Sequence, residues 1–221
     1  MAISASDVKS LRESTGAGMM DCKKALEESG GNMDKAVAWL RERGIAKAAK
    51  RGDKVASEGA VQSYIHMGGK VGVLVEVNCE TDFVARGDDF QELCRNICLQ
   101  ICSTAPLAVR HDELSAAVVA AEKDLYVKQA AETGKPQDIC EKIAEGKLKK
   151  WFSEVCLMDQ PFVKDPDKTI DQIVTELSGK VGEKITVRRF VRYQLGEGIE
   201  KAESNFAEEV AAELEKASQK N

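Results

Sequence analysis

Histidine, proline and aromatic residues are scarce in this sequence of 221 residues, which holds two, four and eleven of them. With only His66 and His111 and no CxxC pair, the chain lacks the usual ligand sets of structural zinc sites. It also lacks the GxSxG and HExxH motifs of common hydrolases. We therefore expect no metal, no cofactor and no catalytic residue. An enzyme with an unrecognised site stays open as a minor alternative.

Long apolar runs are absent as well. No stretch approaches the ~20 apolar residues that a membrane-spanning helix needs. Residues 1–9 contain no apolar segment of the kind found in secretory signal peptides. Seven cysteines, an odd number without a disulfide-like spacing, fit a reducing compartment. These features predict a cytoplasmic protein that does not bind a membrane.

A strong basic balance is also lacking, because the formal net charge is −5. Residues 1–54 are slightly basic and the remainder is acidic. The basic cluster of Lys47, Lys50, Arg51 and Lys54 is interpreted as the solvated end of a helix and a linker. Without interleaved aromatic and basic residues, we expect no direct binding of nucleic acid, although an RNA-binding, ribosome-associated factor stays an alternative.

The first 54 residues predict a compact unit of three helices. Ser6 is suited to cap the first helix, which ends near Ser14 and is followed by a glycine-rich turn at 15–18. The second helix runs from 19 or 20 to 28, and Asn32 is suited to cap the third. Such a small unit has a marginal hydrophobic core, so we expect contacts with a partner or with the rest of the chain to stabilise it.

Beyond a polar link at 52–57, the pattern changes to that of strands. Runs at 61–65 and 71–77 flank Gly68 and Gly69 as in a hairpin, and 185–195 predicts a further strand. Helices are predicted at 88–103, twice within 112–157 on either side of 134–136, at 169–177 and at 206–214, with an extended connector between Pro161 and Pro166. The predicted fold class is α+β: a three-helix unit, then a three-stranded antiparallel sheet backed by helices. We expect domains at 1–54, 55–198 and 199–221.

Three cysteines, Cys94, Cys98 and Cys102, recur every four residues and share one face of the helix predicted at 88–103. A metal site would need further ligands. The neighbouring apolar residues on that face favour the interpretation that these cysteines are small core residues.

The segment at 81–86, sequence TDFVAR, lies where a predicted strand passes into a helix. Thr81 or Asp82 can cap the helix start, and functional residues are often exposed at such junctions. Phe83 can either pack inward as a hydrophobic staple or protrude as an apolar anchor for a partner. Periodicity alone favours the staple.

Several stretches together resemble one family. Residues 15–26, TGAGMMDCKKAL, resemble the glycine turn and second helix of the N-terminal, UBA-like domain of bacterial elongation factor Ts. Residues 76–86, EVNCETDFVAR, resemble that family's signature strand and loop. Further similarities at 160–163, 182–185 and 192–200 follow in the family's order.

This resemblance implies a guanine-nucleotide exchange factor that releases GDP from elongation factor Tu during translation elongation and is not itself an enzyme. It implies that Phe83 inserts as a wedge near the Mg²⁺ and phosphates, that Asp82 fixes the loop, and that Thr81 and Val84 frame it. It also implies that the N-terminal unit docks on a helix of the GTPase through Arg12, Met19, Met20 and Lys23.

The chain departs from the family pattern in two respects. Gly87 stands where the family often has asparagine, which alters the turn but should leave Phe83 presented. Longer members carry two related sheet subdomains in their core. This chain instead passes from the helix ending near Pro106 directly into the helices of the second subdomain. It resembles the short form, in which a second copy can supply the missing half, so we expect a homodimer. A ubiquitin-fold or peptide-binding adaptor stays an alternative, and such an adaptor would lose all activity without residues 1–54.

Overall fold

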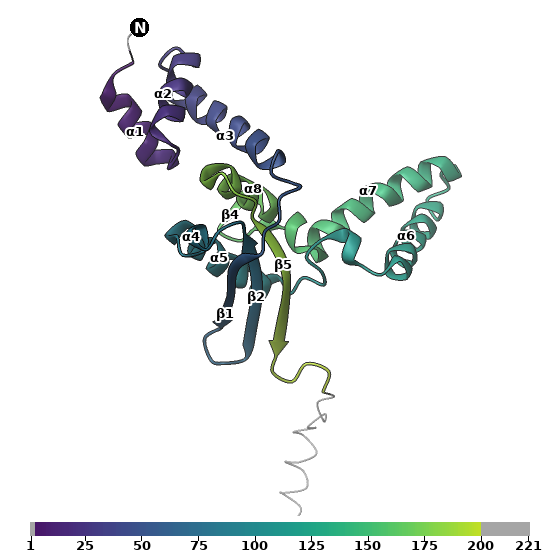
Figure 1. Ribbon diagram of the computed structural model, residues 1–221. Helices are drawn as coiled ribbons and strands as arrows, with labels where there is room; N and C mark the ends of the chain where they lie inside the picture. Colours follow the sequence, from purple (N-terminus) through teal and green to yellow (C-terminus); the bar gives the residue numbers. More distant parts are fainter. Residues whose placement is uncertain (1–2, 200–221) are drawn as a thin grey trace, which may run out of the picture.

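The computed structural model describes residues 3–199, and it confirms the predicted α+β fold class (Figure 1). Helices surround a small antiparallel sheet of three strands. The helix predicted at 206–214 lies outside the described residues, as does all but Ile199 of the predicted module at 199–221. Within 3–199, no helix has the length and apolar character needed to cross a membrane.

The N-terminal unit consists of α1 (Ala5–Thr15), α2 (Met19–Glu28) and α3 (Met33–Ala49), an arrangement consistent with a UBA-like domain. These helices bury their own small cluster of Val8, Leu11, Cys22, Ala25, Leu26 and Ala36. Asn32 caps α3 as predicted, accepting the Lys35 N–H at 2.9 Å.

The predicted cap of the first helix was wrong by two residues. Ser4, in extended conformation, accepts the Asp7 N–H at 3.1 Å, whereas Ser6 lies inside α1 and hydrogen-bonds to the Ser4 hydroxyl. Both serines satisfy the residue preference for a cap, so the sequence pattern alone could not separate them.

The three-stranded sheet has the order β1 (Glu58–Ile65), β2 (Val71–Cys79), β5 (Thr186–Gln194). The turn between β1 and β2 contains Gly68 and Gly69, both at positive φ, where glycine carries no steric cost. The last strand, β5, pairs with β2 from more than a hundred residues away. The register shifts opposite Glu76 and Val77 of β2, where Arg188 of β5 is left without a paired residue on β2.

One face of the sheet packs on α5 (Asp88–Thr104) and, beside it, α8 (Ile170–Val181). Alternate residues of β2, from Val73 to Cys79, point into this core. The prediction that Cys94, Cys98 and Cys102 are core residues is confirmed, because all three are buried there. Burial raises the pKa of the Cys94 thiol to about 12 and that of Cys98 to about 11.

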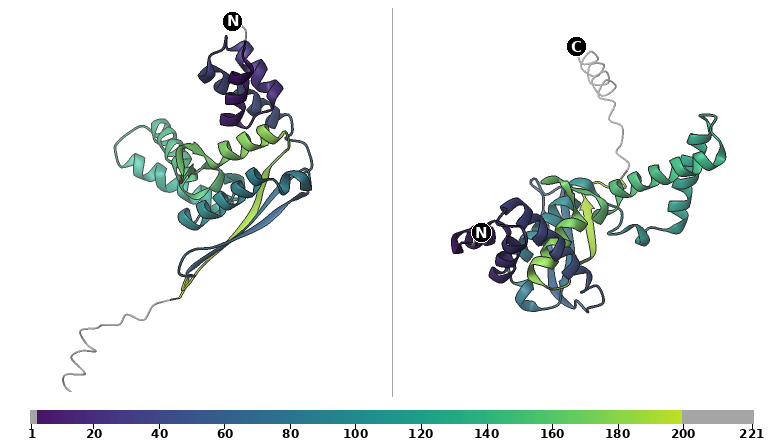
Figure 2. Two further views of the ribbon diagram at one scale, coloured as in Figure 1. Left: turned by 90° about the vertical axis from the view of Figure 1, so that its left-hand side faces the viewer. Right: turned by 90° about the horizontal axis from the view of Figure 1, so that it is seen from above.

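The opposite face of the sheet carries apolar side chains that the described residues leave exposed. Its apolar members, with exposed fractions between 37% and 72%, are Val61, Ile65, Leu74, Val191 and Tyr193. The register places Leu74 of the central strand between Ser63 and Val191. The turned view in Figure 2 shows the sheet as a long arm with its helices gathered toward one end.

The remaining elements lie around this core. A hairpin of α6 (Ala116–Ala131) and α7 (Gln137–Val155) projects sideways in Figure 1, with short 3₁₀ turns at His111–Glu113 and Leu157–Asp159. The connector predicted as merely extended instead contains a two-stranded pairing of β3 (Pro161–Phe162) and β4 (Asp165–Thr169). Prolines at 161 and 166 are compatible with it because such a small pairing leaves positions at which the backbone N–H makes no hydrogen bond to the partner strand.

Candidate functional site

The 81–84 loop, made of Thr81, Asp82, Phe83 and Val84, follows directly after β2. It opens α4 (Asp82–Ala85), a single helical turn. Of the two caps that the sequence left open, Thr81 and Asp82, the structure has Thr81: its backbone is extended and its hydroxyl accepts the Val84 N–H at 3.3 Å. The loop therefore follows the central strand of the sheet and is closed by its own capping residue.

Phe83 protrudes from this turn. Its side chain is 88% exposed, whereas Val84 and Ala85 are buried in the core beneath the sheet. The inward staple that periodicity alone favoured was therefore wrong, and the ring is exposed as the wedge implied by the family resemblance would require. A single helical turn has room for two consecutive residues against the core, and Val84 and Ala85 occupy those positions.

Asp82 pairs with Arg86, four residues later in the same turn. Both side chains are more than half exposed, so this ion pair adds little stability on its own. No bond from the Asp82 carboxylate to the loop's backbone is found among the described residues. Its expected role in fixing the loop stays a prediction.

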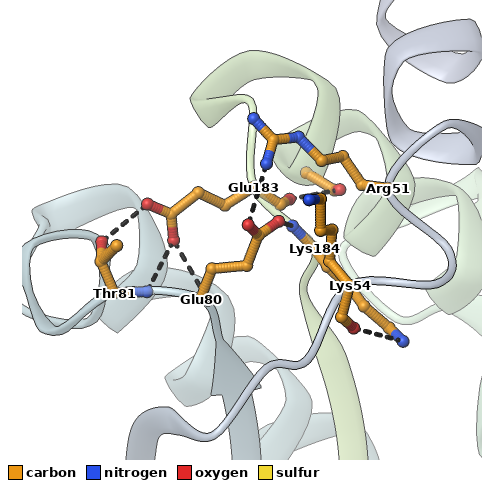
Figure 3. A network of polar contacts seen from close by, with 7 residues as sticks. Arg51, Lys54, Glu80, Thr81, Glu183 and Lys184 are labelled. Carbon is orange, nitrogen blue, oxygen red and sulfur yellow. Dashed lines mark hydrogen bonds and ion pairs between the residues drawn. The ribbon is translucent and has the colours of Figure 1, made fainter.

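A different carboxylate bonds to the loop. Glu183, which lies between α8 and β5, accepts hydrogen bonds from the Thr81 hydroxyl at 2.6 Å and the Thr81 N–H at 3.0 Å. It also accepts the Glu80 N–H at 3.2 Å. Figure 3 shows the three bonds converging on one side chain. Sequence reasoning missed Glu183 as a site residue, although its motif at 182–185 was part of the family resemblance.

Glu80 makes the return contacts to the Glu183 segment. Its carboxylate accepts the Lys184 N–H at 2.7 Å and pairs with Arg51 at 2.9 Å. The Lys184 ammonium donates to the carbonyls of Gly52 and Lys54 (Figure 3). The basic cluster at 47–54 is thus more than a solvated helix end, because Arg51 and the backbone around it are tied to the loop's base.

The other predicted partner-binding residues lie on the N-terminal unit. Arg12 near the end of α1, and Met19, Met20 and Lys23 on α2, are all exposed. Met20 is 75% exposed and Met19 47%, so neither methionine is buried as a staple residue. Lys23 has a long contact of 3.9 Å to Glu27. Together these side chains form an accessible surface of two methionines and two cations.

A crevice of about 330 Å³ separates the α1–α2 turn from α3 and α8. Both carboxylates that line it are paired with cations: Asp21 with Lys47 at 2.8 Å, and Glu176 with Arg41 at 2.9 Å. The hydrogen bond from Lys47 holds the pKa of Asp21 below its ordinary value of 3.8. Within residues 3–199 no three His, Cys, Asp or Glu side chains gather as a metal site.

The groups around the loop are not arranged for covalent chemistry. The Cys79 thiol donates to the Thr81 carbonyl at 3.1 Å, and burial raises its pKa, so it is not a thiolate at neutral pH. Both histidines lie elsewhere: His66 beside the Tyr64 hydroxyl and His111 near Asp159. An exposed phenyl ring on a fixed base is suited to binding a partner.

Comparison with known proteins gives consistent results. The family model described as Elongation factor TS matches residues 5–197. The chain is 56% identical over 212 residues to elongation factor Ts of Desulforamulus reducens, covering 96% of this chain and 98% of that protein. It is 54% identical over 214 residues to elongation factor Ts of Heliobacterium modesticaldum, covering 97% and 100%. With elongation factor Ts of Geobacter metallireducens it shares 55% identity over 212 residues, 96% and 98% of the two chains.

Proposed function

Since this chain belongs to the elongation factor Ts family, the nucleotide-exchange factors of elongation factor Tu in translation, we propose that its 81–84 loop releases GDP by disturbing the Mg²⁺ and phosphate contacts of that GTPase. In this proposal Phe83 is the wedge and Thr81, Asp82 and Val84 hold and frame it. The chain is an exchange factor and not a catalytic enzyme in the usual sense. It requires no cofactor.

The observation that carries the proposal is the exposure of Phe83. A phenylalanine that is 88% exposed contributes little to the chain's own stability, yet its turn is anchored by two buried neighbours and by Glu183. Aromatic residues that are exposed and rigidly held are the usual anchors of protein interfaces. This combination supports a partner-binding role for the loop.

Exchange requires only differential binding. A factor that binds the nucleotide-free GTPase more tightly than the GDP-bound form must weaken GDP binding by the same ratio. Each tenfold of that coupling requires ~1.4 kcal/mol. Mg²⁺ demands near-ideal octahedral geometry, so a small displacement of its surroundings is an effective way to supply such energy.

We propose the N-terminal unit as the second point of attachment. Arg12, Met19, Met20 and Lys23 would dock on a helix of the GTPase domain, with the methionines supplying adaptable apolar contact. The two cations would select an acidic or helix-C-terminal surface on the partner. Expected partners are thus elongation factor Tu and no nucleic acid or membrane, and the place of action is the cytoplasm, where translation occurs.

We also propose that the chain forms a homodimer through the open face of its sheet. That face presents Val61, Ile65, Leu74, Val191 and Tyr193 to solvent. Exposed apolar side chains gathered on one face are characteristic of an interaction site. A second copy, offering the same face, would cover it by two-fold symmetry.

The proposed exchange activity is tested by release of a fluorescent GDP analogue from elongation factor Tu. We expect strong acceleration by the parent chain and a several-fold smaller acceleration by Phe83→Ala. Leu107→Ala serves as the control, since Leu107 is also largely exposed, at 66%, but lies beyond the opposite end of α5. No acceleration by the parent would contradict the function, and a Phe83→Ala variant equal to the parent would contradict the wedge.

A further inference from the structure

We propose that Glu183 is a positioning residue for the 81–84 loop, and that the reciprocal contacts of Glu183 and Glu80 form a clasp that fixes how Phe83 is presented. The inference rests on the proposed function of the loop in exchange. It adds a residue from a distant part of the chain, since Glu183 and Thr81 are 102 positions apart.

The Glu183 carboxylate binds backbone N–H groups that lie just beyond the end of β2. The pairing of β1 with β2 ends at Cys79, opposite Glu58, so the N–H groups of Glu80 and Thr81 lie beyond the ladder. Glu183 accepts both of them, at 3.2 and 3.0 Å. The Glu80 N–H is part-buried, where a backbone donor needs a partner. Thr81 is exposed, and its N–H gains a charged acceptor, which makes the stronger kind of bond.

The third bond, from the Thr81 hydroxyl to Glu183, also restrains the helical turn that carries Phe83. A threonine hydroxyl has a single hydrogen, and in this arrangement it points to Glu183 at 2.6 Å. A lone pair of the same oxygen is then left facing the Val84 N–H, at 3.3 Å. Glu183 therefore orients the cap of α4, and the cap sets the direction of the next residues, including Phe83.

Glu183 is itself held in place before it meets the loop. Gly182, at φ 75°, ends α8 in the left-handed conformation, and the Ser178 hydroxyl donates to the Glu183 carbonyl at 2.6 Å. Ile185, two residues later, is buried as the chain enters β5. The carboxylate thus projects from a short link that is fixed at both ends, which is the arrangement that positions a functional group accurately.

Glu80 closes the clasp from the other side. While the Glu183 side chain binds the backbone at 80–81, the Glu80 side chain binds the backbone N–H of Lys184 at 2.7 Å. Arg51 neutralises Glu80 at 2.9 Å, so the two adjacent carboxylates do not stand unopposed. Because Arg51 follows α3, the clasp also joins the end of the N-terminal unit to the base of the loop.

The test compares Glu183→Ala and Glu183→Gln with the parent chain in GDP release from elongation factor Tu. We expect Glu183→Ala to lower the acceleration on the order of tenfold, since three bonds to one carboxylate are lost. Glu183→Gln, which keeps an acceptor oxygen, should recover part of the loss. Hydrogen–deuterium exchange of the amides at 80–86 should speed up in Glu183→Ala.

A control and a double variant separate positioning from general damage. Glu113→Ala also removes a carboxylate that accepts a backbone N–H, from Val109 at 3.1 Å, away from the loop, and should leave GDP release unchanged. In the Phe83→Ala background, adding Glu183→Ala should lower the rate no further, because Glu183 acts through Phe83.

Two results would overturn the proposal: an unchanged rate and unchanged amide exchange in Glu183→Ala, or an equal loss of rate with and without Phe83. If the parent chain fails to accelerate GDP release, the proposed function fails. Amide exchange at 80–86 would still decide whether the clasp holds the loop.

Discussion

At the scale of single residues, the exposed Phe83 of the 81–84 loop contributes little to the stability of the folded protein. Burying a phenylalanine contributes about 1.5–3 kcal/mol, and Phe83 forgoes most of this at 88% exposed. The cap could be narrowed to Thr81 or Asp82 from the sequence because capping is local. Periodicity could not give the direction of Phe83, because a single turn is too short to show it; only the family resemblance implied a protruding ring. Glu183 was missed since nothing near it in the sequence indicates its partner.

The buried cysteines lead to a prediction about thiol reactivity and pH. Because burial raises the pKa of Cys94 to about 12 and that of Cys98 to about 11, the folded protein keeps both as thiols when unfolded cysteines ionise near 9.0. Their contribution to stability is present below pH 9 and is lost as pH rises through the folded pKa values. We expect Cys94 and Cys98 to resist alkylation at pH 8 in the native protein and to react fully in guanidinium, as read by mass spectrometry. Rapid native labelling of either cysteine would contradict this.

At the scale of elements, α3 and α8 cross at two glycines. A Cβ added at Gly179 would stand 2.5 Å from the Gly44 carbonyl oxygen, so the helices approach as closely as they do only because side chains are absent there. Arg41 of α3 pairs with Glu176 of α8 beside the crossing. This contact seats the N-terminal unit on the core, and the sequence could not predict it because glycine within a helix has no single structural meaning.

Gly179→Ala should therefore destabilise the protein, by about 1–3 kcal/mol, because the added methyl group forces the helices apart. Gly146→Ala in α7 is the matched control: no atom would lie within 4 Å of the new Cβ. There the better helix propensity of alanine should stabilise by about 0.5–1 kcal/mol. Urea unfolding of both variants measures the difference, and a stabilising Gly179→Ala would show that the crossing is not close.

The long amphipathic elements were predictable from the sequence, and the irregular ones were not. The helix at 88–103 corresponds to α5 (Asp88–Thr104), and the strand at 185–195 corresponds to β5 (Thr186–Gln194). The helix expected at 169–177 continues to Val181, where Gly182 ends it in the left-handed conformation. The β3–β4 pairing was missed because two strands of this size carry almost no periodic signal.

At the scale of the whole molecule, the short motifs of the loop and the N-terminal turn indicated the family, whereas the contacts between distant segments emerged only from the structure. The open face of the sheet is the feature that the rest of the described chain leaves incomplete. Leu74 lies at its centre and is 45% exposed. Such a face on a central strand is expected to be covered in solution.

We expect light scattering to give a dimer for the parent chain at micromolar concentration. Leu74→Glu, which places a charge in the middle of the face, should shift it to a monomer. Val118→Glu on α6 is the control, since Val118 is similarly exposed, at 47%, but lies on the projecting hairpin. A parent chain that is a clean monomer at this concentration would contradict the proposed dimer.

The central claim is that Phe83 acts by disturbing the Mg²⁺ and phosphate contacts of elongation factor Tu. Its most direct test is stopped-flow release of a fluorescent GDP analogue, with the parent chain and with Phe83→Ala, first in saturating Mg²⁺ and then after chelation with EDTA. We predict that the parent is several-fold faster than the variant in Mg²⁺ and that the ratio falls toward one once the metal is removed, because the wedge then has nothing left to displace. An equally large ratio in EDTA would contradict the claim and show that Phe83 contributes to binding without acting at the metal.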